Sequence, residues 1–159
     1  MKKEAMKEFT VRVTQASKSE LTVILYEMIL TELKEAKEAH GQGDMTAFDR
    51  ELKLAQKYVT ELQATLNYSY SISYDLLSLY LYVNKSIITA IVRRSPDTLD
   101  SAESILNKLL LSFKGVSDLD KSGPVMRNTQ QLYAGLTYGK GYLNETYVDP
   151  SDQNRGFIV

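Results

Sequence analysis

Two amphipathic helical patterns on either side of a Gly-Gln-Gly break, within residues 17–67, limit the folds open to this chain more than any other feature. In the first pattern, Ser17 and Glu20 form a capping-box signature, so we expect a helix over residues 17–40. Apolar residues then recur at the spacing of one helix face. They are Leu21, Ile24, Leu25, Met28, Ile29, Leu33 and Ala36.

The second pattern follows the break at Gly41 and Gly43, where either Asp44 or Thr46 can cap a new helix. Its apolar residues keep an unbroken four-three-four-three-four spacing, which is typical of a helix with one buried face. They are Phe48, Leu52, Ala55, Val59, Leu62 and Leu66.

The third predicted helix begins near Ser71 or Ser73 and ends around Arg93 and Arg94, where cationic side chains suit the carbonyl end of the helix dipole. It is apolar almost all round rather than on one face. Such a helix is either enclosed by neighbours on both sides or leaves one face open to a partner. We therefore leave two interpretations open, a partner-binding groove and plain burial by the rest of the chain.

We expect Ser95 to cap a fourth helix with Pro96 at its first position, and Gly115 to end that helix. Four helices of similar length joined by short connections favour an all-α, antiparallel up-and-down four-helix bundle. We place the bundle in residues 1–116 and treat residues 117–159 as a C-terminal arm that docks on the bundle or on a partner.

The C-terminal arm is too apolar for a disordered linker. Pro124 is placed to start a short fifth helix with apolar residues along one side. The residues we expect to dock in cis are Val125, Leu132, Tyr133 and Leu136. Either the arm packs on its own bundle as a structural element, or it occupies the partner-binding groove of its own or of a neighbouring molecule until a partner displaces it.

The composition argues against several classes of function. With 19 basic and 20 acidic side chains, the chain has no large electrostatic field to attract nucleic acid or anionic lipid. It has no cysteine and a single histidine, His40, so thiol chemistry, a Glu-x-x-His di-iron site and the usual nucleophilic triad are not available. We therefore expect no catalysis, cofactor or metal.

The charged N-terminus is unlike a signal peptide, and no later run approaches about 18 apolar residues, so we expect an intracellular protein without membrane insertion.

Three stretches of the sequence, by their order and spacing, resemble the flagellar secretion chaperones of the FliS type. The family's Ala-Ser-Pro-Glu-x-Leu start and its Leu-Tyr-Asp/Glu are matched by Ala16, Ser17, Glu20, Leu21, Leu25, Tyr26 and Glu27. The second helix is matched by Ala55, Val59, Glu61, Leu62 and Leu66. The Leu-Tyr-x-Tyr region is matched by Ile72, Ser73, Leu76, Leu79, Tyr80 and Tyr82. The resemblance covers roughly residues 10–115, with Phe9 as the only aromatic residue in an N-terminal arm that usually contains tyrosine.

The resemblance implies a cytoplasmic export chaperone that binds the otherwise unfolded C-terminal segment of flagellin in apolar grooves. It implies that the protein prevents premature polymerisation and helps to deliver flagellin to the flagellar export apparatus. By position, the candidate groove residues here are Leu54, Tyr58, Leu77, Leu81, Ile88 and Val92. We expect a monomer or weak dimer, with components of the export gate as further partners. The alternative is a helical interaction module that is not a chaperone and self-assembles through its C-terminal arm.

Overall fold

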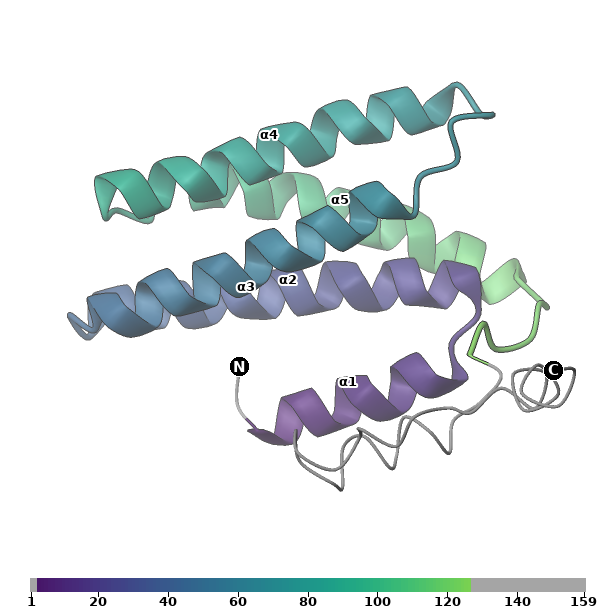
Figure 1. Ribbon diagram of the computed structural model, residues 1–159, viewed down its shortest axis with the longest axis horizontal. Helices are drawn as coiled ribbons and strands as arrows, with labels where there is room; N and C mark the ends of the chain where they lie inside the picture. Colours follow the sequence, from purple (N-terminus) through teal and green to yellow (C-terminus); the bar gives the residue numbers. More distant parts are fainter. Residues whose placement is uncertain (1–2, 127–159) are drawn as a thin grey trace, which may run out of the picture. The chain divides into compact units, whose positions relative to one another are not determined.

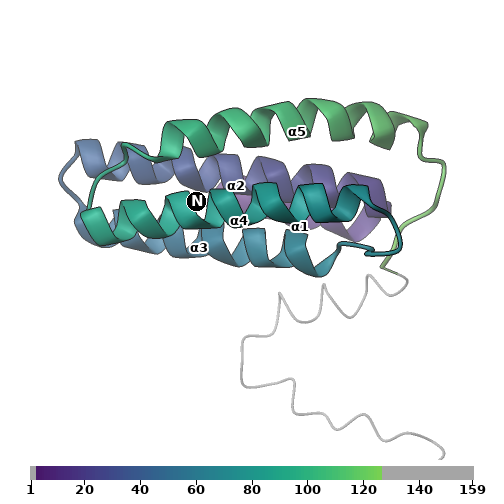
Figure 2. The same cartoon turned by 90° about the horizontal axis from the view of Figure 1, so that it is seen from above.

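A computed structural model of the chain describes residues 3–126, which contain five α-helices and no strand. The helices are α1 (Lys3–Gln15), α2 (Lys18–Gly41), α3 (Met45–Ala64), α4 (Ile72–Arg93) and α5 (Leu99–Leu119). The four helices from α2 onward run alternately up and down (Figure 1). Around the bundle, α2 packs against α3 and α5, and α4 packs against the other side of both (Figure 2). The predicted all-α, antiparallel up-and-down four-helix bundle is therefore confirmed.

The start of α2 and the turn into α3 follow the sequence pattern closely. The Ser17 hydroxyl accepts a hydrogen bond from the Glu20 N–H, and the Glu20 carboxylate accepts one from the Ser17 N–H at 2.7 Å, which completes the capping box. Gly43 has a φ of 75°, a left-handed conformation that glycine adopts without steric cost. Asp44 caps α3, because its carboxylate accepts the N–H of Ala47 at 2.9 Å.

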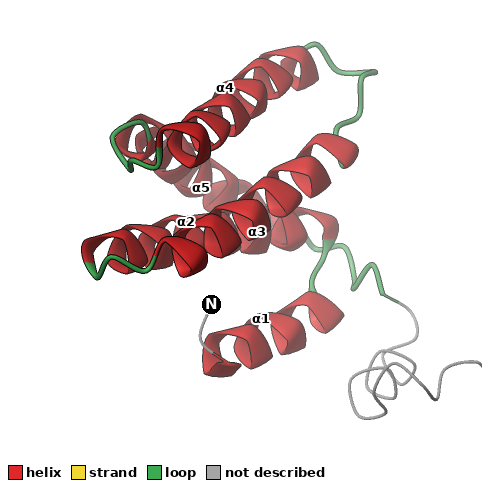
Figure 3. Cartoon of the chain, turned by 60° about the vertical axis from the view of Figure 1, so that its left-hand side comes forward, coloured by secondary structure: helices red, strands yellow, loops and turns green. Residues whose placement is uncertain are grey.

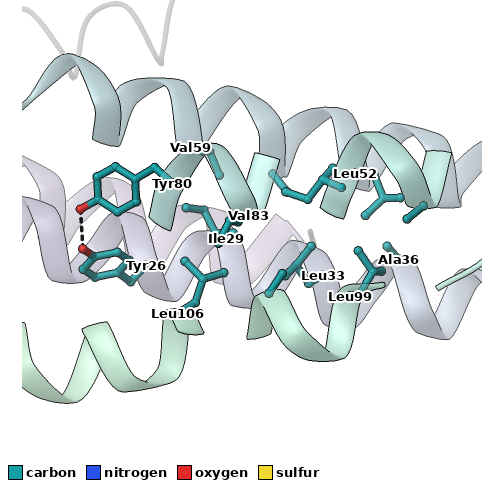
Figure 4. Packing of buried hydrophobic residues seen from close by; sticks show 14 of the residues in the cluster. Tyr26, Ile29, Leu33, Ala36, Leu52, Val59, Tyr80, Val83, Leu99 and Leu106 are labelled. Carbon is teal, nitrogen blue, oxygen red and sulfur yellow. Dashed lines mark hydrogen bonds between the residues drawn. The ribbon is translucent and has the colours of Figure 1, made fainter. Parts of the chain in front are cut away.

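The hydrophobic core lies between α2, α3, α4 and α5. The predicted apolar face of α3 lies in it, whereas on α2 the core includes Tyr26, and Leu21 and Met28 of the predicted face are only half-buried. At one end of this core the hydroxyl oxygens of Tyr26 and Tyr80 lie 2.5 Å apart (Figure 4). The ring of Phe113 packs edge-on against Tyr26, with 5.5 Å between the ring centroids. The core residues are Tyr26, Ile29, Leu33, Ala36, Ala39, Phe48, Leu52, Ala55, Val59, Leu62, Tyr80, Val83, Ile87, Ala90, Leu99, Ala102 and Leu106.

Residues 3–15 form a helix, α1, that the sequence did not predict. Its half-buried apolar side chains include Ala5, Phe9 and Val13, spaced four residues apart, so its apolar stripe is narrow. It packs on α2, on the side of the bundle away from α4 (Figures 1 and 3). The guanidinium of Arg12 binds the carboxylate of Glu27 on α2 at 2.6 Å. The fifth helix in the described part of the chain is thus N-terminal.

The start of α5 differs from the prediction. The helix begins at Leu99 rather than at Pro96, and the Leu99 N–H donates to the Pro96 carbonyl at 2.9 Å to form a turn. The Ser95 hydroxyl accepts the N–H of Asp97 within this turn, so Ser95 stabilises the turn and does not cap the helix.

The end of α5 also differs, because Gly115 lies inside the helix instead of ending it. Gly115 does not take the left-handed conformation that ends many helices, and the helix continues to Leu119. The backbone is extended at Asp120, and the Asp120 carboxylate accepts a hydrogen bond from the Ser19 hydroxyl of α2 at 2.5 Å. The predicted boundary at residue 116 therefore falls within α5.

The structure describes only the first residues of the predicted C-terminal arm beyond α5. The N–H of Val125 donates to the Ala16 carbonyl at 3.0 Å, at the junction of α1 and α2, while the Val125 side chain is exposed. Leu132, Tyr133 and Leu136 lie outside the described residues. The compact unit that contains the bundle ends at Val125.

Candidate partner-binding surface

Helix α4 buries one face in the core and leaves an apolar face exposed. Four of its apolar residues form what we call the α4 strip: Leu77, Leu81, Ile88 and Val92. Leu77 is half-buried, whereas Leu81, Ile88 and Val92 are 53%, 44% and 76% exposed. Since a cluster of large apolar side chains on the surface of a bundle is unfavourable in water, the strip is a candidate for covering by a partner.

The α4 strip borders one flank of α3. Asn84 lies about one helical turn from both Leu81 and Ile88, so it shares their side of α4. Its side-chain oxygen accepts a hydrogen bond from the Gln56 amide of α3 at 3.2 Å. Because α3 and α4 are antiparallel, the C-terminal half of the strip, with Ile88 and Val92, lies beside the N-terminal half of α3.

A hollow of about 570 Å³ opens at this end of the strip, where the N-terminal half of α3 meets the C-terminal end of α4. We call it the α3–α4 hollow. Its lining combines cations, one carboxylate and apolar side chains. The lining residues are Met45, Thr46, Asp49, Arg50, Lys53, Leu54 and Arg94.

The charges of the α3–α4 hollow are incompletely paired. Arg50 binds the carboxylate of Glu51, its neighbour in sequence. In contrast, Lys53 and Arg94 make no ion pair with any residue in the described range. One carboxylate oxygen of Asp49 is buried and has no hydrogen-bond donor among the described residues. The hollow thus presents two cations without an acidic partner among the described residues, whereas the buried oxygen of Asp49 is closed to solvent.

The backbone holds Arg94 in an unusual conformation. Its φ of 52° is left-handed, a region that costs a residue with a Cβ roughly 1–2 kcal/mol. The Arg94 carbonyl lies 3.1 Å from Nε2 of His40, and the His40 ring packs against Phe48 with 5.2 Å between centroids. The single histidine of the chain therefore ties the end of α2 to the end of α4.

The other two groove candidates lie elsewhere on α3. Leu54 is half-buried and lines the α3–α4 hollow. Tyr58 lies on the flank of α3 that faces α2, where burial and the nearby Glu32 and Glu51 raise the pKa of its hydroxyl. The structure brings Leu77, Leu81, Ile88 and Val92 together on one helix face of α4, places Leu54 in the lining of the α3–α4 hollow, and does not bring Tyr58 to the strip.

A second hollow, of about 540 Å³, lies between α1, α2 and the end of α5. Glu27 is its central charge, with Arg12 at 2.6 Å and Lys114 at 3.1 Å. Burial favours the neutral carboxyl, but the hydrogen bonds from Arg12 and Lys114 outweigh it and hold the pKa of Glu27 below its ordinary value. These charges satisfy one another, so we assign this network to holding three helices together.

The described residues contain no group of three or more His, Asp or Glu side chains that could hold a metal ion. One helix in this range, α4, is long and apolar enough to cross a membrane by length and composition alone, although we expected no such stretch. Core helices of globular proteins pass the same test. Tyr80, Val83 and Ile87 of α4 are buried in the bundle core, so this is weak evidence for a membrane span.

A comparison with models of known protein families shows to which family the chain belongs. The family model described as flagellar protein FliS matches residues 1–120, which include all five helices described above. The chain belongs to the FliS family. The FliS family is a family of flagellar chaperones rather than enzymes, and this chain is such a chaperone. No curated protein sequence matches the chain.

Part of this FliS surface escaped the sequence analysis. The sequence pattern indicated no role for Lys53, and it indicated Arg94 only as a cation that suits a helix end. Lys53 and Arg94 are about forty residues apart in sequence, and only the packing of α3 against α4 brings them to the same hollow. A cationic pair at the end of α4 was visible in the sequence, but nothing local linked it to Asp49 or Lys53.

Proposed function

We propose that this FliS-family protein is a cytoplasmic export chaperone that binds the otherwise unfolded C-terminal segment of flagellin on the α4 strip. Bound in this way, the segment cannot pair with other flagellin molecules, which prevents premature polymerisation. The complex would then deliver flagellin to the export apparatus, with components of the export gate as further partners. The observation that carries the proposal is the exposed apolar face of α4 in a chain that the FliS family model matches over residues 1–120.

The energetics favour binding through a few apolar anchors. Complete burial of an exposed leucine, isoleucine or valine side chain contributes about 1.5–3 kcal/mol. Folding of the client on the surface costs ordering entropy, which offsets part of this gain. Leu81, Ile88 and Val92 are the most exposed members of the strip, so we expect them to supply most of the affinity, with a smaller contribution from the half-buried Leu77.

Titration calorimetry with the C-terminal segment of flagellin from the same organism tests this proposal on the full chain. We expect one-to-one binding by the wild-type protein and at least about a tenfold loss of affinity in Leu81→Glu, because the carboxylate would be buried against an apolar client. The matched control is Leu111→Glu, which places the same charge at a 74% exposed leucine of α5.

Circular dichroism during thermal unfolding establishes that both variants fold. Equal loss of affinity in Leu81→Glu and Leu111→Glu would remove the α4 strip from the proposal. A wild-type protein that does not bind flagellin but self-associates with rising concentration would favour the helical self-assembly module instead.

A further inference from the structure

We propose that the outward side of α3 and α4 adsorbs to the surface of an anionic lipid bilayer without crossing it. The surface that makes this contact, which we call the basic apolar face, combines the α4 strip with four exposed cations beside it. These cations are Lys53, Lys57, Lys85 and Arg94. The proposal goes beyond the proposed function and does not depend on it, because the ligand is a lipid surface and not a client protein.

On α4, cations lie along the apolar strip and at its end. Lys85 lies four residues after Leu81 and three before Ile88, so it shares their side of the helix. Arg94 follows Val92 closely and ends α4. Neither Lys85 nor Arg94 makes an ion pair with another described residue, so both are available to an anionic surface.

On α3, two lysines border the same strip. The Gln56 amide donates to Asn84 of α4 at 3.2 Å, which identifies the flank of α3 that lies next to α4. Lys53 lies one turn before Gln56, and Lys57 lies one turn after Lys53. Both lysines are exposed and without an ion pair among the described residues. Lys53 also lines the α3–α4 hollow together with Arg94, so the two helices present their cations on one side.

The positive charge of the basic apolar face contrasts with the whole chain, whose formal net charge is -1. Within α3 and α4 the exposed carboxylates are those of Glu61 and Asp75. Both lie toward the turn that joins the two helices, at the opposite end from Arg94. The charge of this face therefore depends on the packing of α3 beside α4 and does not appear in the net charge.

Aromatic side chains extend the strip at the end where α4 begins. Tyr74 lies one turn before Leu77 and two turns before Leu81, so it continues the same side of α4. Its ring packs on that of Tyr68 with 5.5 Å between the centroids, and the two side chains are 58% and 47% exposed. Tyrosine is enriched at the headgroup level of membranes, because its ring is apolar and its hydroxyl is polar.

The combination of lysine with exposed aliphatic side chains favours a bilayer over a protein partner. Lysine is depleted at protein–protein interfaces, and three of the four cations here are lysines. Surfaces that lie on membranes instead combine basic residues with leucine-like and aromatic side chains, which enter the boundary between headgroups and acyl chains. Because the basic apolar face includes the α4 strip, the protein cannot hold a client there and lie on a bilayer at the same time.

Sedimentation with lipid vesicles measures adsorption of the full-length protein. We expect the protein to bind vesicles of phosphatidylcholine mixed with phosphatidylglycerol at least about tenfold more tightly than vesicles of phosphatidylcholine alone. This preference should weaken with rising salt, which screens the attraction between the cations and the lipid phosphates.

Two pairs of substitutions with the same change in net charge locate the contact. Lys53→Gln with Lys85→Gln removes one cation of the face from each helix and should weaken binding to the anionic vesicles roughly twentyfold, since each basic residue near the bilayer contributes roughly fivefold. Lys34→Gln with Lys108→Gln removes two exposed cations from α2 and α5 and should keep wild-type binding. Circular dichroism during thermal unfolding establishes that both proteins fold.

A tryptophan reporter tests whether the apolar strip itself leaves water. The chain has no tryptophan, so Val92→Trp places a single fluorophore at a position of the strip that is 76% exposed. Leu111→Trp places it at a 74% exposed position of α5. With anionic vesicles the emission of Val92→Trp should shift to shorter wavelength, whereas that of Leu111→Trp should not change.

Failure to bind anionic vesicles, equal losses in the two lysine pairs, or no emission shift at residue 92 would overturn the proposal. Binding to soluble polyglutamate without binding to vesicles would also overturn it and would assign the face to an acidic protein. None of these measurements uses flagellin, so their failure is distinct from failure of the proposed function, which the flagellin titration tests.

Discussion

Tyr26 and Tyr80 place two hydroxyl groups in the core, and among the described residues each hydroxyl has only the other as its hydrogen-bond partner. Both side chains are at most 1% exposed, and burial raises the pKa of both hydroxyls. We expect Tyr26→Phe to destabilise the protein by about 1–3 kcal/mol, because the Tyr80 hydroxyl then remains buried without a partner. Adding Tyr80→Phe should restore part of the loss, so the double variant costs less than the sum of the two single variants. Urea unfolding of the four proteins measures this coupling, and strict additivity would contradict it.

Glu32 is a carboxyl group buried between α2 and α3. Burial, followed by the neighbouring Glu51, raises the pKa of Glu32 to about 7. Burial also favours the neutral form of Glu51, but hydrogen bonds and nearby charges, with the hydrogen bond from Arg50 first among them, together outweigh burial and lower the pKa of Glu51. The folded protein thus binds a proton at Glu32 more tightly than the unfolded chain does, while the opposite holds for Glu51.

The pH dependence of the free energy of unfolding follows from the raised pKa of Glu32 and the lowered pKa of Glu51. The contribution of Glu32 is complete below the unfolded pKa of about 4.5 and is lost as pH rises to about 7, by up to about 1.4 kcal/mol per pH unit. The contribution of Glu51 is lost as pH falls below about 4.5. We expect Glu32→Gln to remove the decline between pH 5 and 7 and to be more stable than wild type at pH 8. Urea unfolding at each pH measures this, and the exposed Glu38→Gln should keep the wild-type slope.

At the scale of the element, some capping signals in the sequence correspond to capping hydrogen bonds in the structure, and others do not. Ser17 and Glu20 form the capping box their spacing predicts, because both partners lie in one helical turn. Ser71 stands at the corresponding position of α4 but makes no capping hydrogen bond through its side chain. Ser95 has a capping residue type and sits before a proline, yet its hydroxyl is used in a turn. The residue type therefore indicates a candidate cap, and the local backbone conformation determines whether the side chain makes the capping hydrogen bond.

The two serines give a direct comparison. We expect Ser17→Ala to lower the free energy of unfolding by about 1 kcal/mol, since two N–H groups at the start of α2 lose or weaken their partners. Ser71→Ala should change it by less than about 0.5 kcal/mol. Denaturant unfolding measures both, and a larger loss for Ser71→Ala than for Ser17→Ala would refute the assignment.

At the scale of the whole molecule, α1 is the element with the fewest ties to the rest of the bundle. It packs chiefly on α2, whereas α3, α4 and α5 each pack on two neighbours and α2 packs on three. Elements with few buried contacts open locally at low free energy.

We expect the amides of α1 to exchange with solvent faster than the core amides of α2 to α5. Arg12→Ala should speed exchange in α1 further and leave α3 and α4 unchanged, because it removes the ion pair to Glu27. Lys7→Ala, an exposed residue of the same helix, is the control in mass-spectrometric hydrogen exchange.

The sequence by itself determined the four bundle helices, most of their ends, the apolar face of α3 and the surplus apolar face of α4. These are local properties, because helix spacing and caps involve residues within a turn or two of one another. Tertiary structure decided that α1 is a helix on the far side from α4, that α5 starts after a turn and runs past Gly115, and that Tyr58 faces α2. It also decided that Lys53, Asp49 and Arg94 share one hollow. Such contacts join residues far apart in sequence, and only the packing of one helix against another brings them together.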